Sequence, residues 1–77
     1  MSNRPIFIIE YDVIEDEWHI SKMSQAQLEL TSLRLEFVTH FIAGDSNSYL
    51  VPIKRDNIYE AFKVGYDQIK GVMSNNY

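Results

Sequence analysis

The residues of this chain that are best suited to chemistry form an acidic run near the N-terminus. The run supplies five carboxylates with no Lys or Arg among them: Glu10, Asp12, Glu15, Asp16 and Glu17. Carboxylates at this density can bind a divalent cation or attract a basic partner. The run lacks the spacing, the glycine and the closing Glu of a calcium loop, so we predict no metal site. We interpret it, together with the neighbouring Trp18, as a surface that binds a basic partner. The alternative is that Trp18 belongs to the core and that the charges protect a sheet edge.

The other polar side chains do not combine into a catalytic site. His19 and His40 are the only histidines, and His40 with Glu36 gives two ligands one helical turn apart, which is too few for zinc. The serines at 46 and 48 lie in a loop without a positioned base or a G-x-S-x-G motif. We therefore expect no catalytic residue, no cofactor and no enzymatic activity.

Length and composition limit the chain to a small globular domain. With 77 residues and a hydrophobic share of 45%, it has room for one core. We predict a single domain over residues 1–77, with frayed tails at 1–4 and 74–77. The absence of cysteine excludes disulfides and thiolate metal sites, and the net charge of −4 opposes binding to nucleic acid or to an anionic membrane. No apolar run is long enough for a membrane helix or a signal peptide, so we expect a cytoplasmic protein.

Hydrophobic patterns with a period of two predict a β-hairpin that carries the acidic run. The segment 5–13 is rich in β-branched and aromatic residues, and the segment 17–22 alternates apolar and polar side chains. Residues 14–16 between them are predicted to form the turn. A third strand is predicted over 49–53, at a sheet edge or ending early, because Pro52 cannot donate to a ladder.

The last third of the chain predicts a helix. Apolar residues recur at helical spacing from Ile58 to Val72, and Asp56 is positioned to cap the N-terminus.

The stretch 24–43 fits both a helix and a strand. As a helix, its apolar residues share one face, Ser24 and Gln27 form a capping box, and Gly44 ends it. As a strand, its second half alternates, but a bulge is required near 31–32. We predict the helix, because it needs no bulge and because its first half consists of good helix formers.

These elements predict an α+β fold, in which two helices cover a small antiparallel sheet in the order ββαβα. The alternative is a four-stranded meander followed by a C-terminal helix. In the first arrangement, the helix over 24–43 has a second apolar face, which the rest of the chain, a second copy or a foreign partner would cover. We predict a homodimer that associates through this face, formed by Leu28, Leu35, Val38 and Ile42.

The expected function is stoichiometric binding to a larger, basic-surfaced protein, without direct contact to nucleic acid or membrane. The chain is similar in size and acidity to accessory proteins such as phage-encoded inhibitors and immunity proteins, which is a similarity of type alone. An alternative function is imitation of a nucleic-acid backbone by the carboxylates, which would block a DNA- or RNA-binding protein.

Overall fold

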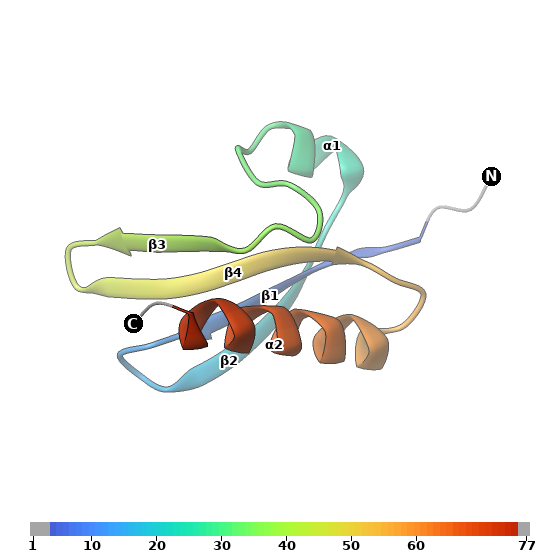
Figure 1. Cartoon of the computed structure of the whole chain (residues 1–77). Helices are drawn as coiled ribbons and strands as arrows, with labels where there is room; N and C mark the ends of the chain where they lie inside the picture. Colours follow the sequence, from blue (N-terminus) through green and yellow to red (C-terminus); the bar gives the residue numbers. More distant parts are fainter. Residues whose placement is uncertain (1–3, 76–77) are drawn as a thin grey trace.

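The computed structural model describes residues 4–75 and contains one four-stranded antiparallel sheet and two helices (Figure 1). The spatial order of the strands is β2-β1-β4-β3. In chain order the elements are β1 (Ile6–Asp12), β2 (Glu17–Met23), α1 (Gln25–Glu29), β3 (Thr39–Ala43), β4 (Ser46–Lys54) and α2 (Ile58–Ser74). The predicted α+β class, with a small antiparallel sheet and two helices, is confirmed. The observed chain order, ββαββα, has one strand more than the predicted ββαβα. The predicted alternative, a four-stranded meander, is also not observed, because β1 lies between β2 and β4.

The sheet is apolar on both faces at its centre, because β1 begins with four consecutive apolar residues, Ile6 to Ile9, which are buried alternately on the two faces. The main core lies between the sheet and α2, and its buried residues are Phe7, Ile9, Tyr49, Val51, Ile53, Ala61 and Ile69. A smaller core lies on the other face, where Leu28 of α1 packs against Ile6 and Ile8. The two helices therefore lie on opposite sides of the sheet.

The predicted N-terminal hairpin is confirmed. β1 and β2 pair in an antiparallel register that runs from Ile6 opposite Met23 to Asp12 opposite Glu17. The connecting turn spans residues 13–16 and brings the acidic residues together at one end of the sheet.

The single helix predicted over residues 24–43 is wrong. The capping box of Ser24 and Gln27 is present, but α1 ends at Glu29, and residues 39–43 form strand β3. The alternative of a strand over the whole stretch is also wrong, because an irregular segment separates α1 from β3.

Local hydrogen bonds explain why α1 stops. The hydroxyl of Thr31 donates to the carbonyl of Leu28 at 2.7 Å and accepts from the amide of Leu33 at 3.0 Å. A Thr side chain that binds nearby backbone groups in this way offers the chain an alternative to the helical ladder. From residue 37 onward, aromatic and β-branched residues then favour a strand.

Gly44 begins the turn between β3 and β4 and does not end a helix. The loop has two residues, because Ala43 pairs with Ser46, and Gly44 has φ 57°. Two-residue hairpin loops require a positive φ at their first position, which glycine adopts without strain.

Pro52 lies within an interior strand, although the sequence predicts an edge or an early end. β4 continues to Lys54, but its pairing with β3 stops at Leu50. At Pro52, on the side of β4 away from β1, the one backbone hydrogen bond among residues 4–75 is donated by the amide of Glu36 to the Pro52 carbonyl, at 2.8 Å. A proline is tolerated there because no ladder donor is needed.

The predicted C-terminal helix is confirmed, but its cap is not Asp56. Asn57 is the N-cap, and its side chain accepts from the amide of Glu60 at 2.9 Å. Asp56 forms an ion pair with Arg4 instead, at 3.2 Å. Of the predicted frayed tails, residues 1–3 and 76–77 lie outside the described residues, and Ser74 is the last residue of α2.

Candidate interaction surface

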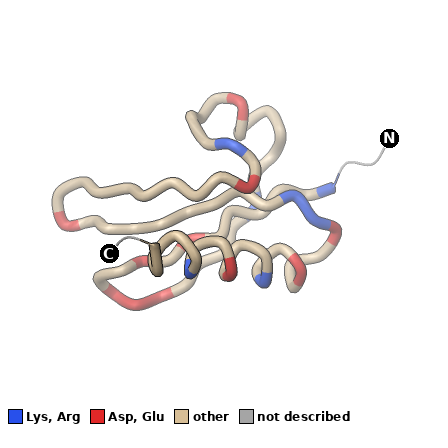
Figure 2. Tube along the Cα trace, viewed as in Figure 1, with Lys and Arg blue, Asp and Glu red and all other residues tan. Residues whose placement is uncertain are grey.

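The acidic residues predicted to bind a partner divide between the sheet and the turn of the β1–β2 hairpin. Side chains alternate along a strand, so Glu10, Asp12 and Glu17 share the face that points away from α2. Glu15 and Asp16 lie in the turn. Figure 2 shows acidic residues gathered around this turn and basic residues near the opposite end of the sheet, where β4 leads to α2. The hairpin turn is therefore an acidic end of the molecule.

Asp12 and Glu17 lie directly opposite each other in the hairpin register. Opposed like charges destabilise a strand pair, because the two Cβ atoms are only about 5 Å apart. Asp12 Oδ1 accepts from the amide of Glu15 at 3.1 Å, and Glu17 Oε1 lies 3.5 Å from Nε2 of His19. Within residues 4–75 neither carboxylate forms an ion pair with a Lys or an Arg.

Asp16 bonds to an aromatic side chain of the same hairpin. The hydroxyl of Tyr11 donates to Asp16 Oδ1 at 2.6 Å. This hydrogen bond raises the pKa of Tyr11, and partial desolvation and the negative charges of Asp16 and Asp12 act in the same direction. Asp16 has φ 55°, a left-handed conformation that Asp and Asn adopt more readily than most residues.

Trp18 does not lie with the acidic residues of the sheet. Its ring lies 4.7 Å from that of Tyr11 and 4.7 Å from that of Tyr66, and it meets the ring of Phe62 edge to face at 5.7 Å. The last two residues belong to α2, so Trp18 packs under the helix at the margin of the main core. Its position follows from alternation, because Trp18 and Glu17 are neighbours in one strand.

An apolar groove of about 370 Å³ opens beside this aromatic cluster, between β2 and the first two turns of α2. It is lined by Ile20, Ile58, Tyr59 and Phe62. Ile58 is 50% exposed and Tyr59 is 87% exposed, although both are large apolar side chains. Because β2 is an edge strand, the groove lies next to an open row of backbone groups.

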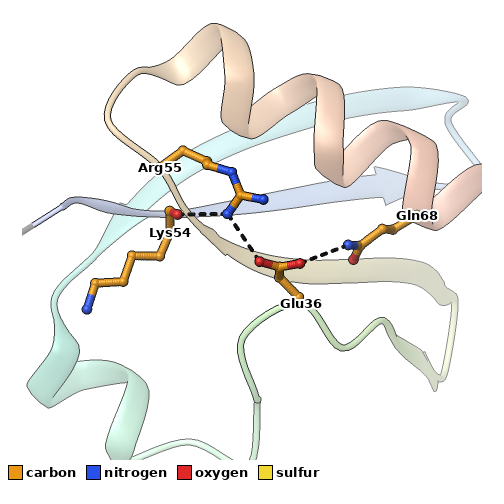
Figure 3. Close-up of polar contacts among 4 residues, drawn as sticks. All are labelled: Glu36, Lys54, Arg55 and Gln68. Atoms are coloured by element: carbon orange, nitrogen blue, oxygen red, sulfur yellow. Dashed lines mark hydrogen bonds and ion pairs between the residues drawn. The ribbon is translucent and has the colours of Figure 1, made fainter.

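A second groove, of about 410 Å³, lies on the other side of α2, beside the segment that precedes β3. One wall carries Glu36, whose carboxylate accepts from Nη1 of Arg55 at 3.1 Å and from Nε2 of Gln68 at 3.4 Å (Figure 3). The same arginine nitrogen donates to the carbonyl of Lys54. These contacts fasten the irregular segment to β4 and α2, so the polar groups here have a structural role.

The residues predicted to mediate self-association do not share a face. Leu28 is buried in the smaller core, and Val38 packs against the main core. Leu35 is exposed in the irregular segment, and Ile42 is exposed on edge strand β3. They separate because the helix that would have aligned them does not form.

The sequence-based interpretation missed the groove because it placed Ile58 and Phe62 in the buried stripe of the last helix. The buried residues of α2 are Ala61, Gly65 and Ile69, and of these Ala61 was not part of the predicted stripe. A usable signal was present in the pair Ile58-Tyr59, since adjacent residues of a helix point about 100° apart and two large apolar side chains cannot both lie at the centre of the buried face.

Among residues 4–75, no group of three or more His, Cys, Asp or Glu side chains is arranged to hold a metal ion. The same residues contain no helix that is long and apolar enough to cross a membrane. Comparison with protein-family models, with curated proteins and with solved structures found no match. The groove between β2 and α2 is therefore identified as the candidate site from its geometry and chemistry alone.

Proposed function

We propose that this protein is a non-enzymatic interaction module that binds an extended segment of a larger protein, one to one, in the groove between β2 and α2. The observation that carries the proposal is the groove itself, an apolar depression beside an open strand edge. An inhibitor or accessory protein acts in this way, by occupying a segment that its partner needs for another contact.

Strand addition explains why the edge and the groove occur together. An extended segment gains affinity from main-chain hydrogen bonds to the sheet edge, and its alternate side chains gain specificity from adjacent pockets. In this chain the side chain of Ile20 points to the α2 side of β2, as do those of Trp18 and Lys22. Every second side chain of an added strand would therefore point toward α2, and one of them would lie over the groove.

Tyr59 and Ile58 are suited to contact such a segment. Tyrosine supplies a large rigid contact area, and it is enriched among the residues that dominate binding energy at interfaces. Both residues lie in the first turn of α2, which is held by its N-cap Asn57 and by the aromatic packing of Phe62 and Trp18. The contact surface is thus presented on a rigid element.

The proposal is tested by selection from a library of random linear peptides against the full chain, followed by titration of the enriched peptides in a calorimeter. We expect enriched peptides to bind with a stoichiometry of one. The variant Ile58→Asp should weaken binding at least about tenfold, because it places a charge in the apolar groove. Its fold should be retained, since an acidic residue in the first turn of a helix is favourable to the helix dipole.

The matched control is Leu30→Asp. Leu30 is 89% exposed at the C-cap of α1, on the other side of the sheet. This substitution introduces the same charge at another solvent-exposed aliphatic residue, far from the groove, and should leave binding unchanged. The groove would be ruled out as the site if Ile58→Asp and Leu30→Asp weakened binding equally. It would also be ruled out if neither variant changed the affinity.

A further inference from the structure

The open edge of β2 has a defined polarity, because alternate residues of a strand direct their backbone groups to opposite sides. The carbonyl of Pro5 and the amide of Val13 both bond to the β4 side of the sheet, at Arg55 and Asn47. Odd-numbered residues of β1 therefore face β4, and even-numbered residues face β2. In the β1–β2 register the even residues of β1 pair with Glu17, His19, Ser21 and Met23.

It follows that three residues of β2 direct their amide and carbonyl groups outward, namely Trp18, Ile20 and Lys22. Among the described residues, no backbone hydrogen bond outside the β1–β2 ladder involves these groups. The same three residues carry side chains on the α2 side of the sheet. An added strand would therefore hydrogen-bond where the apolar groove also lies.

We infer that the segment bound at this edge is an antiparallel strand with a large apolar residue followed, three positions later, by Lys or Arg. This inference rests on the proposed function and names the chemistry of the partner. In an antiparallel pairing, the segment residue opposite Ile20 lies on the α2 side, over the groove. The residue three positions later lies opposite Glu17 and points to the other face, because three is an odd number of steps.

Charge complementarity selects the basic residue. The segment position opposite Glu17 adjoins that carboxylate, and Asp12 lies behind Glu17 on β1, one strand further from the segment, with Glu10 on the same face of β1. Glu17 is exposed, and its only ion-pair contact within residues 4–75 is the histidine two positions along its own strand. A cation at this position would offset the repulsion between the two carboxylates, which no Lys or Arg of the described chain does.

A second copy of this chain does not supply that chemistry. If the β2 strands of two copies paired about a two-fold axis, the residues whose backbone groups face outward in one copy would have to lie opposite such residues in the other. Glu17, which faces inward, would then lie opposite Glu17, His19, Ser21 or Met23 of the copy in every such register. None of these residues is Lys or Arg, and Lys22 cannot lie opposite Glu17 because its backbone groups face outward. The other edge strand of a copy, β3, contains no Lys or Arg either. We therefore assign the edge of β2 to a segment of a different protein.

The antiparallel direction gives the order of the two determinants. In a parallel pairing the basic residue would precede the apolar residue by three positions. All strand pairs of this sheet are antiparallel, and antiparallel pairing is slightly the more stable per residue.

Synthetic peptides test the inference against the full chain, with affinities measured by calorimetry or by NMR titration. The reference peptide is Ser-Thr-Phe-Thr-Val-Arg-Thr-Ser with blocked ends. Replacement of its Phe by Ser should weaken binding at least about tenfold, and replacement of its Arg by Glu should weaken it about three- to tenfold, less so at high salt. The peptide of reversed sequence should bind more weakly than the reference.

Charge exchange gives the decisive comparison. Glu17→Lys should weaken binding of the Arg peptide and strengthen binding of the Glu peptide, whereas Glu29→Lys, the same charge change on α1, should do neither. Equal effects of the two variants, or equal binding of the reversed peptide, would overturn the inference. If the inference is overturned in this way but the Phe peptides still lose binding in the Ile58→Asp variant, the proposed function stands and only the inference about the basic residue is wrong. If no peptide of the set binds and library selection also fails, both are wrong.

Discussion

At the scale of single residues, Gly65 shows how closely α2 approaches the sheet. A Cβ atom built at Gly65 would lie 2.5 Å from Cγ1 and 2.7 Å from Cβ of Ile9, which is fully buried at the centre of β1. Because the Cβ of Ile9 is fixed by its backbone, the side chain cannot move aside. The absence of a side chain at position 65 therefore sets the distance between helix and sheet.

We expect Gly65→Ala to lower the free energy of unfolding by about 1–3 kcal/mol, because the steric cost exceeds the helix propensity that alanine adds. The control is Gly71→Ala in the same helix, where a Cβ would meet nothing within 4 Å. In that variant the free energy of unfolding should rise by up to about 1 kcal/mol, because alanine has the higher helix propensity. Urea denaturation of the two variants measures both values, and a stabilised Gly65→Ala would contradict the observed packing.

The hydrogen bond between Tyr11 and Asp16 predicts a pH dependence. It raises the pKa of Tyr11 in the folded state, so the folded chain holds the phenolic proton more tightly than the unfolded chain does. The resulting stability is present below the ordinary tyrosine pKa of about 10 and is lost as the pH rises through the folded-state value.

The variant Asp16→Asn should lower the pKa of Tyr11 toward its ordinary value while tolerating the left-handed backbone. Titration of tyrosinate absorbance measures this, with Tyr11→Phe to assign the signal. A Tyr11 pKa that is the same in Asp16→Asn and in the natural chain would show that the bond does not persist in solution.

At the scale of elements, patterns confined to a few residues predicted structure well. The alternation in β1 and β2, the Ser24–Gln27 capping box and the long amphipathic helix α2 were all readable from the chain. Each depends on neighbouring residues alone. The candidate groove was not predicted, because it forms where α2 crosses beside β2, and sequence periodicity carries no information on that crossing.

The error over residues 24–43 has an identifiable cause. Leucines at helical spacing continue past α1, but Leu30 is almost fully exposed, so the spacing alone did not signify burial. The decisive features were the hydroxyl of Thr31, which competes for helical backbone groups, and the pair Gly44-Asp45, which is a two-residue hairpin signal. Given that signal, a strand before Gly44 was the better prediction.

Leu28 tests whether the short helix α1 contributes to stability. Its side chain is 6% exposed and closes the smaller core over Ile6 and Ile8. We expect Leu28→Ala to lower the free energy of unfolding by about 2–5 kcal/mol, the usual effect of truncating a buried leucine. Leu30→Ala, two residues further on, should change stability by less than about 0.5 kcal/mol. Thermal or urea denaturation distinguishes the two, and equal effects would mean that α1 does not pack as described.

At the scale of the whole molecule, the homodimer stays a prediction, and edge strand β3 is the surface at which we expect the two copies to meet. This edge strand contains no Lys, Arg, Asp, Glu or Pro, and Phe41 and Ile42 are 50% and 65% exposed. Natural edges are usually protected by such residues. We expect association that increases with concentration and that Ile42→Lys reduces, as measured by light scattering. A monomer at all concentrations would refute the prediction.

The alternative of a nucleic-acid mimic also stays a prediction, and the geometry makes it separable from the proposed function. The carboxylates of the sheet lie on the face away from α2, whereas the groove lies on the α2 side. A mimic would lose affinity steeply with salt and would not respond to Ile58→Asp. A segment-binding module would respond to Ile58→Asp at every salt concentration.

The central claim, that a partner segment adds to the open edge of β2, is tested most directly by amide hydrogen exchange. In the free protein the outward amides of Trp18, Ile20 and Lys22 should exchange fast, and saturation with a library-selected peptide should slow them at least about tenfold. On the other edge of the sheet, the amides of His40 and Ile42 point outward by the same alternation and serve as the internal control. Slowed exchange confined to β2 is the predicted result. Slowed exchange at His40 and Ile42 instead, or unchanged exchange at β2 in the saturated complex, would contradict the claim.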